Sequence, residues 1–178
     1  MKRRLFLILT LAFAAQTAFA GIYDDLLQAI DNDDTATVTA ILQRGMDVNA
    51  VDKTGNSLLT LAVQKENVDL VRFLLEHRAR VQTRNQYGDT PVMLAALKGN
   101  IKIVKLLVTA GAELNYPGWT PLLYAAYAGH EEVVDFLIHN GADINAKAPN
   151  QATALTLAAQ NKHTKVVKLL KLAGAKEE

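Results

Sequence analysis

Apolar residues recur along the chain in steps of about 33 residues. In each step a valine is followed three residues later by a larger aliphatic residue, and this spacing puts both side chains on one helical face. The pairs are Val38 and Ile41, Val71 and Leu74, Val104 and Leu107, Val134 and Leu137, and Val167 and Leu170. Such a period indicates stacked units, none of which can bury its apolar face alone.

Each unit is predicted to contain two short helices. Thr90 and Thr120 stand directly before a proline, a pattern typical of a capped helix start. Small alanines that recur in register, as at Ala95 and Ala125, would let two helices approach closely. The ten helices are expected at 22–31, 35–44, 57–65, 68–77, 90–98, 101–110, 120–128, 131–140, 153–161 and 164–172, with Thr35 as the cap of the second. The expected fold class is therefore all-α.

The recurring residues resemble those of the ankyrin repeat. The fourth unit shows this best, reading Gly-Trp-Thr-Pro at 118–121, Ala-Ala at 125–126, Gly-His at 129–130 and Gly-Ala-Asp-Ile-Asn-Ala at 141–146. The resemblance implies a solenoid of about five helix-turn-helix units with short hairpin-like loops, the repeats lying near 22–50, 51–83, 84–116, 117–146 and 147–178. It also implies that a partner contacts the loop tips and the exposed side of the first helices.

Three departures from the family pattern carry predictions. Where the family has a histidine after Thr-Pro-Leu, this chain has Thr60, Met93, Leu123 and Thr156, so the polar network between loops should be weaker. Arg78 stands at a position where the other units have a helix-ending glycine. Three residues are missing between Asn115 and Gly118, so the loop before the fourth unit should be shortened.

Residues 1–20 form the pattern of a cleaved secretory signal. Lys2, Arg3 and Arg4 precede an apolar run, and Ala18-Phe19-Ala20 is a small-x-small cleavage site. A mature domain of residues 21–178 without a membrane anchor is expected. A bacterial periplasmic protein is the natural interpretation, exported by the general secretory route, although the arginine pair also fits a loose twin-arginine pattern.

Charge is distributed unevenly along this mature chain. Without residues 1–20 there are 16 Lys and Arg against 18 Asp and Glu, a near balance that gives no indication of nucleic-acid binding. Residues 21–50 nevertheless carry six aspartates against Arg44, whereas residues 147–178 carry six lysines against Glu177 and Glu178. Two solvated end caps explain this pattern, with a monomer as the expected state. Head-to-tail association of two molecules is the alternative.

No catalytic residue, metal site or cofactor is expected, and the chain is predicted not to be an enzyme. It has no cysteine, and Ser57, its only serine, is interpreted as a helix cap. His130 and His163 occupy equivalent positions in adjacent units, which favours a structural role at the start of the second helix.

A partner surface is predicted from the position of aromatic and charged residues. The partner-binding residues are expected to be Tyr87, Tyr116, Trp119, Tyr127, Asp89, Lys98, Lys53 and Lys65. Trp119 and Tyr127 could be exposed anchors, or Trp119 could fill the gap beside the shortened loop. Tyr124 aligns with Leu61, Leu94 and Leu157 and is interpreted as core.

These observations lead to a first hypothesis of a non-catalytic periplasmic module that binds another exported or membrane protein. Similar exported ankyrin proteins suggest a specific version, an auxiliary role in peroxide or stress defence. One alternative is an immunity-type protein that neutralises a periplasmic toxin. A hydrolase or a metal-binding protein is a further alternative, although the repeat pattern already accounts for most distinctive polar residues.

Overall fold

The computed structural model describes residues 21–176, and the predicted signal segment lies outside them. The described chain forms two compact units, the first ending at Asp47 and the second beginning at Val48. Helices and loops make up both units, and the only β-type pairing in the described part is an isolated bridge between Val51 and Ser57. The all-α prediction is therefore confirmed.

The first unit contains a helix over 21–31 and α2 (Thr35–Gln43). Leu26, Ile30 and Val38 are buried in it. The cap of α2 is Asp34 and not Thr35, so that prediction was wrong by one residue. The Asp34 carboxylate accepts hydrogen bonds from the backbone N–H and the hydroxyl of Thr37, which lower its pKa. An ionised carboxylate can accept both bonds at once.

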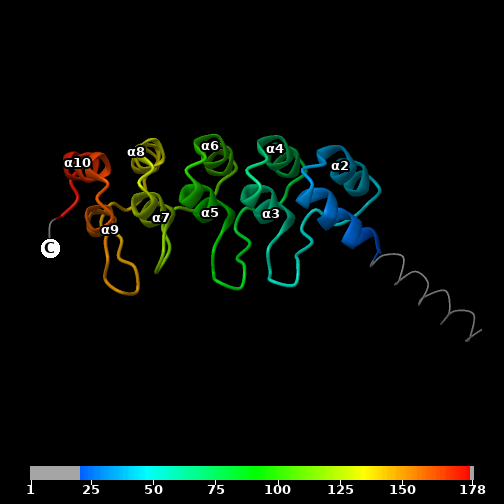
Figure 1. Ribbon diagram of the computed structural model, residues 1–178, viewed down its shortest axis with the longest axis horizontal. Coiled ribbons are helices and arrows are strands. Elements are labelled where there is room, and N and C mark those ends of the chain that lie inside the picture. Colours follow the sequence, from blue (N-terminus) through cyan, green and yellow to red (C-terminus); the bar gives the residue numbers. More distant parts are fainter. Residues whose placement is uncertain (1–20, 177–178) are drawn as a thin grey trace, which may run out of the picture. The chain divides into compact units, whose positions relative to one another are not determined.

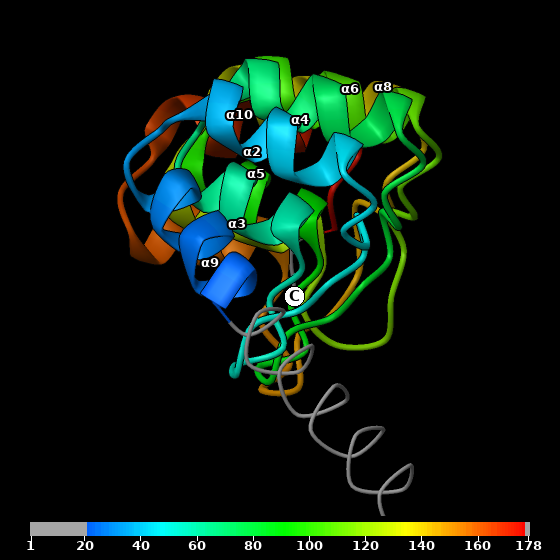
Figure 2. The same cartoon turned by 90° about the vertical axis from the view of Figure 1, so that its right-hand side faces the viewer.

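The second unit contains four helix pairs. They are α3 (Leu58–Gln64) with α4 (Val68–Glu76), α5 (Pro91–Lys98) with α6 (Ile101–Thr109), α7 (Pro121–Ala128) with α8 (Glu131–His139), and α9 (Ala154–Gln160) with α10 (Thr164–Leu172). Within this unit the first helices form one layer and the second helices another (Figure 1). The hairpin loops all project from the side of the first helices (Figure 2).

Small and branched apolar side chains hold the layers of the second unit together. Ala62, Ala95, Ala125 and Ala158 are fully buried, as their role in close helix contact requires. The leucines Leu74, Leu107, Leu137 and Leu170 are fully buried as well. The recurring sequence positions are thus the core of the solenoid, and burial of this apolar surface is its main source of stability.

Helix ends follow the predicted chemistry. Thr90 and Thr120 are N-caps, each followed by a proline in the first turn, and the Ser57 hydroxyl accepts a hydrogen bond from the N–H of Thr60. Gly111 ends α6 with a positive φ of 86°, and Arg78 adopts the same left-handed region with φ 63°. An arginine side chain therefore occupies a backbone conformation that costs L-residues other than glycine free energy.

Three of the four hairpins are closed by the same two backbone hydrogen bonds. In the first of them, Asp52 N–H donates to Asn56 O and Gly55 N–H donates to Asp52 O. The hairpins at 85–89 and 148–152 repeat this pair of bonds. The loop before α7 has no equivalent bonds between described residues, as the predicted deletion requires.

At the positions where the family has a histidine, the side chains make no bond between loops within residues 21–176, and other groups join neighbouring hairpins: Asn85 Nδ2 donates to Asn56 Oδ1 at 3.2 Å, and Gln86 N–H donates to Thr54 O at 3.0 Å. The hydroxyl of Thr60 pairs with Ser57 of its own repeat at 2.9 Å, and Thr156 pairs with Thr153 in the same way. Met93 has no hydroxyl, and the buried Oγ1 of Thr90 has no hydrogen-bond partner among the described residues. These side chains therefore stabilise single repeats and not the contact between repeats.

No helix within residues 21–176 is long and apolar enough to span a bilayer.

Candidate functional site

The eight predicted partner-binding residues belong to the hairpins or to the ends of the first helices of the second unit. Tyr87, at the tip of its hairpin, is the most exposed of the described aromatic residues, with 78% of its surface accessible. Tyr127 near the end of α7 is 47% exposed. Lys53 lies at a hairpin tip, and Lys65 and Lys98 lie where α3 and α5 end, all three exposed. Whether these residues bind a partner stays a prediction.

Three aromatic rings of the fourth repeat form a cluster. The ring centroids of Trp119 and Tyr124 are 5.0 Å apart, and those of Trp119 and Tyr127 are 6.5 Å apart with nearly perpendicular planes. Trp119 is half-buried, so its ring fills space beside the shortened loop and also leaves part of its surface accessible. Whether Trp119 anchors a partner stays a prediction.

Tyr124 is a correction to the sequence analysis. It is half-buried and not a core residue, and its hydroxyl donates a 2.7 Å hydrogen bond to Oδ1 of Asp89 in the preceding repeat. Burial raises the pKa of Tyr124, and the hydrogen bond to Asp89 raises it further, so the hydroxyl stays protonated. Leu61 and Leu94 at the equivalent positions are half-buried as well, so the error was to take this position for core. Leucine cannot make the bond to Asp89, which is particular to this repeat. Oδ2 of Asp89 accepts no hydrogen bond from the described residues.

Tyr116 is held in place by its own neighbours. Its hydroxyl donates to Oε1 of Gln82, and the guanidinium of Arg84 lies 4.3 Å above its ring. Burial is the main reason that the pKa of Tyr116 is raised. Arg84 was not among the predicted residues, and no regular spacing in the sequence connects it with Tyr116. This arrangement leaves Tyr116 less available to a partner than Tyr87 or Tyr127.

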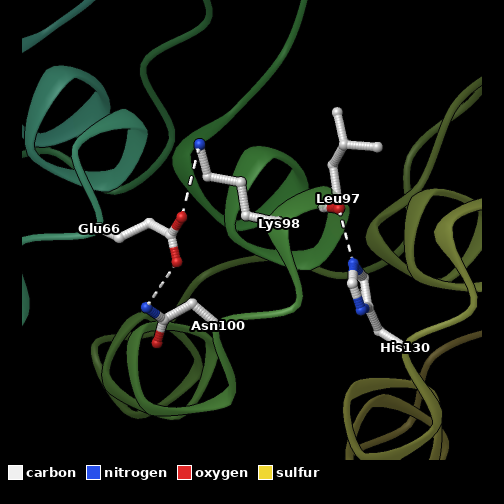
Figure 3. Close-up of polar contacts among 5 residues, drawn as sticks. All are labelled: Glu66, Leu97, Lys98, Asn100 and His130. Atoms are coloured by element: carbon white, nitrogen blue, oxygen red, sulfur yellow. Dashed lines mark hydrogen bonds and ion pairs between the residues drawn. The ribbon is translucent and has the colours of Figure 1, made fainter.

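The ends of the first helices are linked to the next repeat by side chains (Figure 3). Glu66 forms a 3.7 Å ion pair with Lys98 and accepts a 3.2 Å hydrogen bond from Asn100. In the following repeat His130 takes the place of Asn100, and its Nε2 donates to the carbonyl of Leu97 at 2.9 Å. His163 repeats this bond to the carbonyl of Tyr127. Both histidines stand at N-cap positions, but their side chains make no capping bond. The bonds to the preceding repeat confirm their predicted structural role.

Glycine is required opposite each of these imidazole rings. A Cβ atom built on Gly99 would lie 2.3 Å from Nδ1 of His130, and one on Gly129 would lie 2.5 Å from Nδ1 of His163. Both glycines have positive φ, and so does Glu66 at the equivalent position. Two types of junction between repeats therefore occur here. In one, a glycine faces the histidine of the next repeat, and in the other Glu66 faces Asn100 of the next repeat.

Asp52 organises the first hairpin of the second unit. Its carboxylate accepts hydrogen bonds from the backbone of Thr54 and Asn56 and from the Thr54 hydroxyl, at 2.7–2.9 Å. Burial alone would raise the pKa of Asp52, but these hydrogen bonds together leave it below the usual value. The carboxylate thus belongs to the internal structure of the loop.

Comparisons with known proteins agree with this architecture. A family model described as "Ankyrin repeats (3 copies)" matches residues 26–117, 80–148 and 115–177. A search of curated proteins finds no match to the chain. Ankyrin repeats are generally protein–protein interaction modules, and the family is typically non-enzymatic. Because the matches together extend over most of the sequence, the chain belongs to the ankyrin repeat family.

Proposed function

We propose that this protein is a non-catalytic, periplasmic interaction module that binds another exported or membrane protein through the first-helix and hairpin side of its second unit. One copy carries the whole surface, so binding needs no second copy. Stacked repeats present a preordered surface, and little conformational freedom is lost when a partner docks on it.

The observation that carries this proposal is a set of three aromatic side chains on that side of the second unit, Tyr87, Trp119 and Tyr127, here called the aromatic group. Tyr87 is largely accessible, Tyr127 is about half accessible, and Trp119 lies in contact with Tyr127. Exposed tyrosine and tryptophan are the residues that contribute most to protein interfaces, because they bury a large area with few rotatable bonds. Oδ2 of Asp89 adds an acceptor beside the ring cluster, where a donor of the partner could bind.

The test is affinity capture from periplasmic extract with the purified protein as bait, followed by mass spectrometry. Tyr87→Ala combined with Tyr127→Ala should lose the proteins that the wild type captures, with the helical circular-dichroism signal retained. Arg72→Ala is the control, because Arg72 is an exposed residue of α4 on the second-helix layer and lies outside the proposed surface. Equal capture by the double variant and the wild type would remove the proposed surface.

Export is a separate part of the proposal and is supported by the pattern of residues 1–20 alone. N-terminal sequencing of the protein recovered from the cell envelope should give Gly21 as the first residue. Recovery of the protein with Met1 in the cytoplasm would contradict periplasmic export. It would leave the binding surface untouched, since that surface lies wholly between residues 48 and 176.

An auxiliary role in peroxide or stress defence is the more specific version of this function. It rests on the resemblance to exported ankyrin proteins and predicts that a deletion strain is more sensitive to hydrogen peroxide. Complementation with the wild-type gene should restore resistance, whereas complementation with the Tyr87→Ala and Tyr127→Ala variant should not. Unchanged peroxide sensitivity of the deletion strain would refute this version.

A further inference from the structure

The two ends of the chain carry opposite charge on exposed side chains. In the first unit, Arg44 is opposed by six aspartates, and all of them are exposed: Asp24, Asp25, Asp31, Asp33, Asp34 and Asp47. In the last repeat, residues 147–176 contain six exposed lysines and no acidic residue: Lys147, Lys162, Lys165, Lys168, Lys171 and Lys176. Between them, residues 48–146 hold nine Lys and Arg against ten Asp and Glu. The imbalance is therefore confined to the ends.

Each charged end also exposes a large aliphatic side chain. Ile22 is 43% exposed beside Asp24 and Asp25, and Leu172 is 80% exposed beside Lys168 and Lys171. Leu172 borders a groove between α8 and α10 whose apolar lining includes Ile138 and Leu169. Glu131 and Asp135 of α8 line the same groove, and Lys165 pairs with Glu131 at 3.3 Å, so part of the positive charge of the last repeat is already opposed within the chain. An apolar centre with a charged rim is the usual composition of a protein interface.

Solubility of the end repeats does not explain opposite signs. An outer face stays in solution if its charges are all acidic or all basic, and equal signs at both ends would keep copies apart. Opposite signs instead favour contact between the first unit of one molecule and the last repeat of another. The near-neutral repeats between the ends add little repulsion.

We propose that the acidic first unit of one copy docks on the basic last repeat of a second copy, so that the protein associates head to tail. The contact is heterologous, because two different surfaces meet, and each dimer therefore keeps one acidic and one basic surface for further copies. This goes beyond the monomer expected from the sequence. It does not involve the aromatic group at Tyr87 and Tyr127, so its failure would leave the proposed partner surface unaffected.

Salt dependence is the first test. Sedimentation velocity of the purified protein at about 10 mM salt, where charges act over about 30 Å, should show an average mass that rises with protein concentration. At about 1 M salt, where the range is about 3 Å, the mass should be that of one chain. A single chain at every concentration in low salt would overturn the proposal and favour two solvated end caps.

Two triple variants then locate the contact. The first-unit variant carries Asp24→Lys, Asp25→Lys and Asp33→Lys, and the last-repeat variant carries Lys162→Glu, Lys168→Glu and Lys176→Glu. Asp33 and Lys162 occupy equivalent positions with φ 56° and 61°, and Glu66 adopts φ 57° at the same position, so the left-handed backbone accommodates these exchanges. Circular dichroism verifies that each variant retains its helical content.

Each variant alone should be monomeric in low salt. An equimolar mixture should form dimers but no larger species, because only one intact acidic surface and one intact basic surface remain per pair. As a matched control, Arg72→Glu, Arg80→Glu and Lys102→Glu make the same charge change as the last-repeat variant at exposed positions of the middle repeats, and they should leave association intact. Association of either triple variant alone, or a mixture that stays monomeric, would overturn the proposal.

Discussion

The junction between Gly99 and His130 provides the sharpest test of how neighbouring repeats fit together. In Gly99→Ala the new methyl group would lie 2.3 Å from Nδ1 and 2.5 Å from Cε1 of the imidazole. Because non-bonded heavy atoms do not approach this closely, the ring must move away. Its 2.9 Å hydrogen bond to the carbonyl of Leu97 would then be lost.

Two terms set the size of the effect. A residue with a Cβ atom at φ 76° costs about 1–2 kcal/mol relative to glycine. Loss of the histidine hydrogen bond adds about 0.5–1.5 kcal/mol. We therefore expect Gly99→Ala to lower the free energy of unfolding by about 1.5–3.5 kcal/mol, which for a chain of this size lowers Tm by about 3–14 °C.

A double-mutant cycle with His130→Asn separates the two terms. Asparagine is the residue that the preceding junction places opposite Glu66, and it removes the ring from the path of the new methyl group. In that background Gly99→Ala should cost only the left-handed strain, about 1–2 kcal/mol. Urea denaturation followed by circular dichroism measures all four proteins. Additive effects, within about 0.5 kcal/mol, would refute the steric pairing of glycine with histidine.

Three further outcomes are expected. Ala95→Leu should destabilise the protein by about 1–3 kcal/mol through overpacking, because Ala95 is fully buried between helices; unchanged thermal unfolding would argue against close contact there. Arg78→Gly should raise the free energy of unfolding by about 0.5–1 kcal/mol. Relief of the left-handed backbone strain at φ 63° outweighs the conformational entropy that glycine adds to the unfolded chain. A lower Tm would show instead that the arginine side chain stabilises the fold by more than this strain costs. Asp52→Asn should reduce the loss of stability that the protein shows below about pH 4. The pKa of Asp52 is lower in the folded than in the unfolded protein, so its carboxylate stabilises the fold above the unfolded-state pKa, and this stabilisation disappears as the pH falls through the folded-state pKa. Asn85 forms the equivalent loop bonds without a charge, and parallel Tm–pH curves for wild type and variant would contradict this assignment.

The repeat period made most of the fold predictable. Residues that recur in register, such as Val104, Leu107 and Ala95, serve the same packing purpose in each unit, so one pattern located the helices to within a residue or two. Thr90 and Gly111 marked helix ends because capping and left-handed backbone favour few residue types. The misplaced cap at Asp34 lies in the first unit, where the repeat pattern is degenerate and two capping residues are adjacent.

The candidate site was less predictable, because its contacts join residues that do not recur. The bond from Tyr124 to Asp89 depends on a tyrosine that replaces leucine in one repeat only. The stacking of Arg84 on Tyr116 likewise depends on one hairpin and one shortened loop. Positions of this kind follow from the orientation of single side chains, which a periodic pattern does not contain.

The paired junctions restrict how such an array can be lengthened by duplication. If the fourth repeat were duplicated directly behind itself, the His130 of the new copy would face Gly129 of the original. The same combination of glycine and histidine already occurs in this chain, where Gly129 meets His163. A copy of the third repeat inserted after itself would set Asn100 against Gly99, without the glutamate that Asn100 contacts in this chain. Tandem expansion of the array is therefore physically easiest through its fourth repeat.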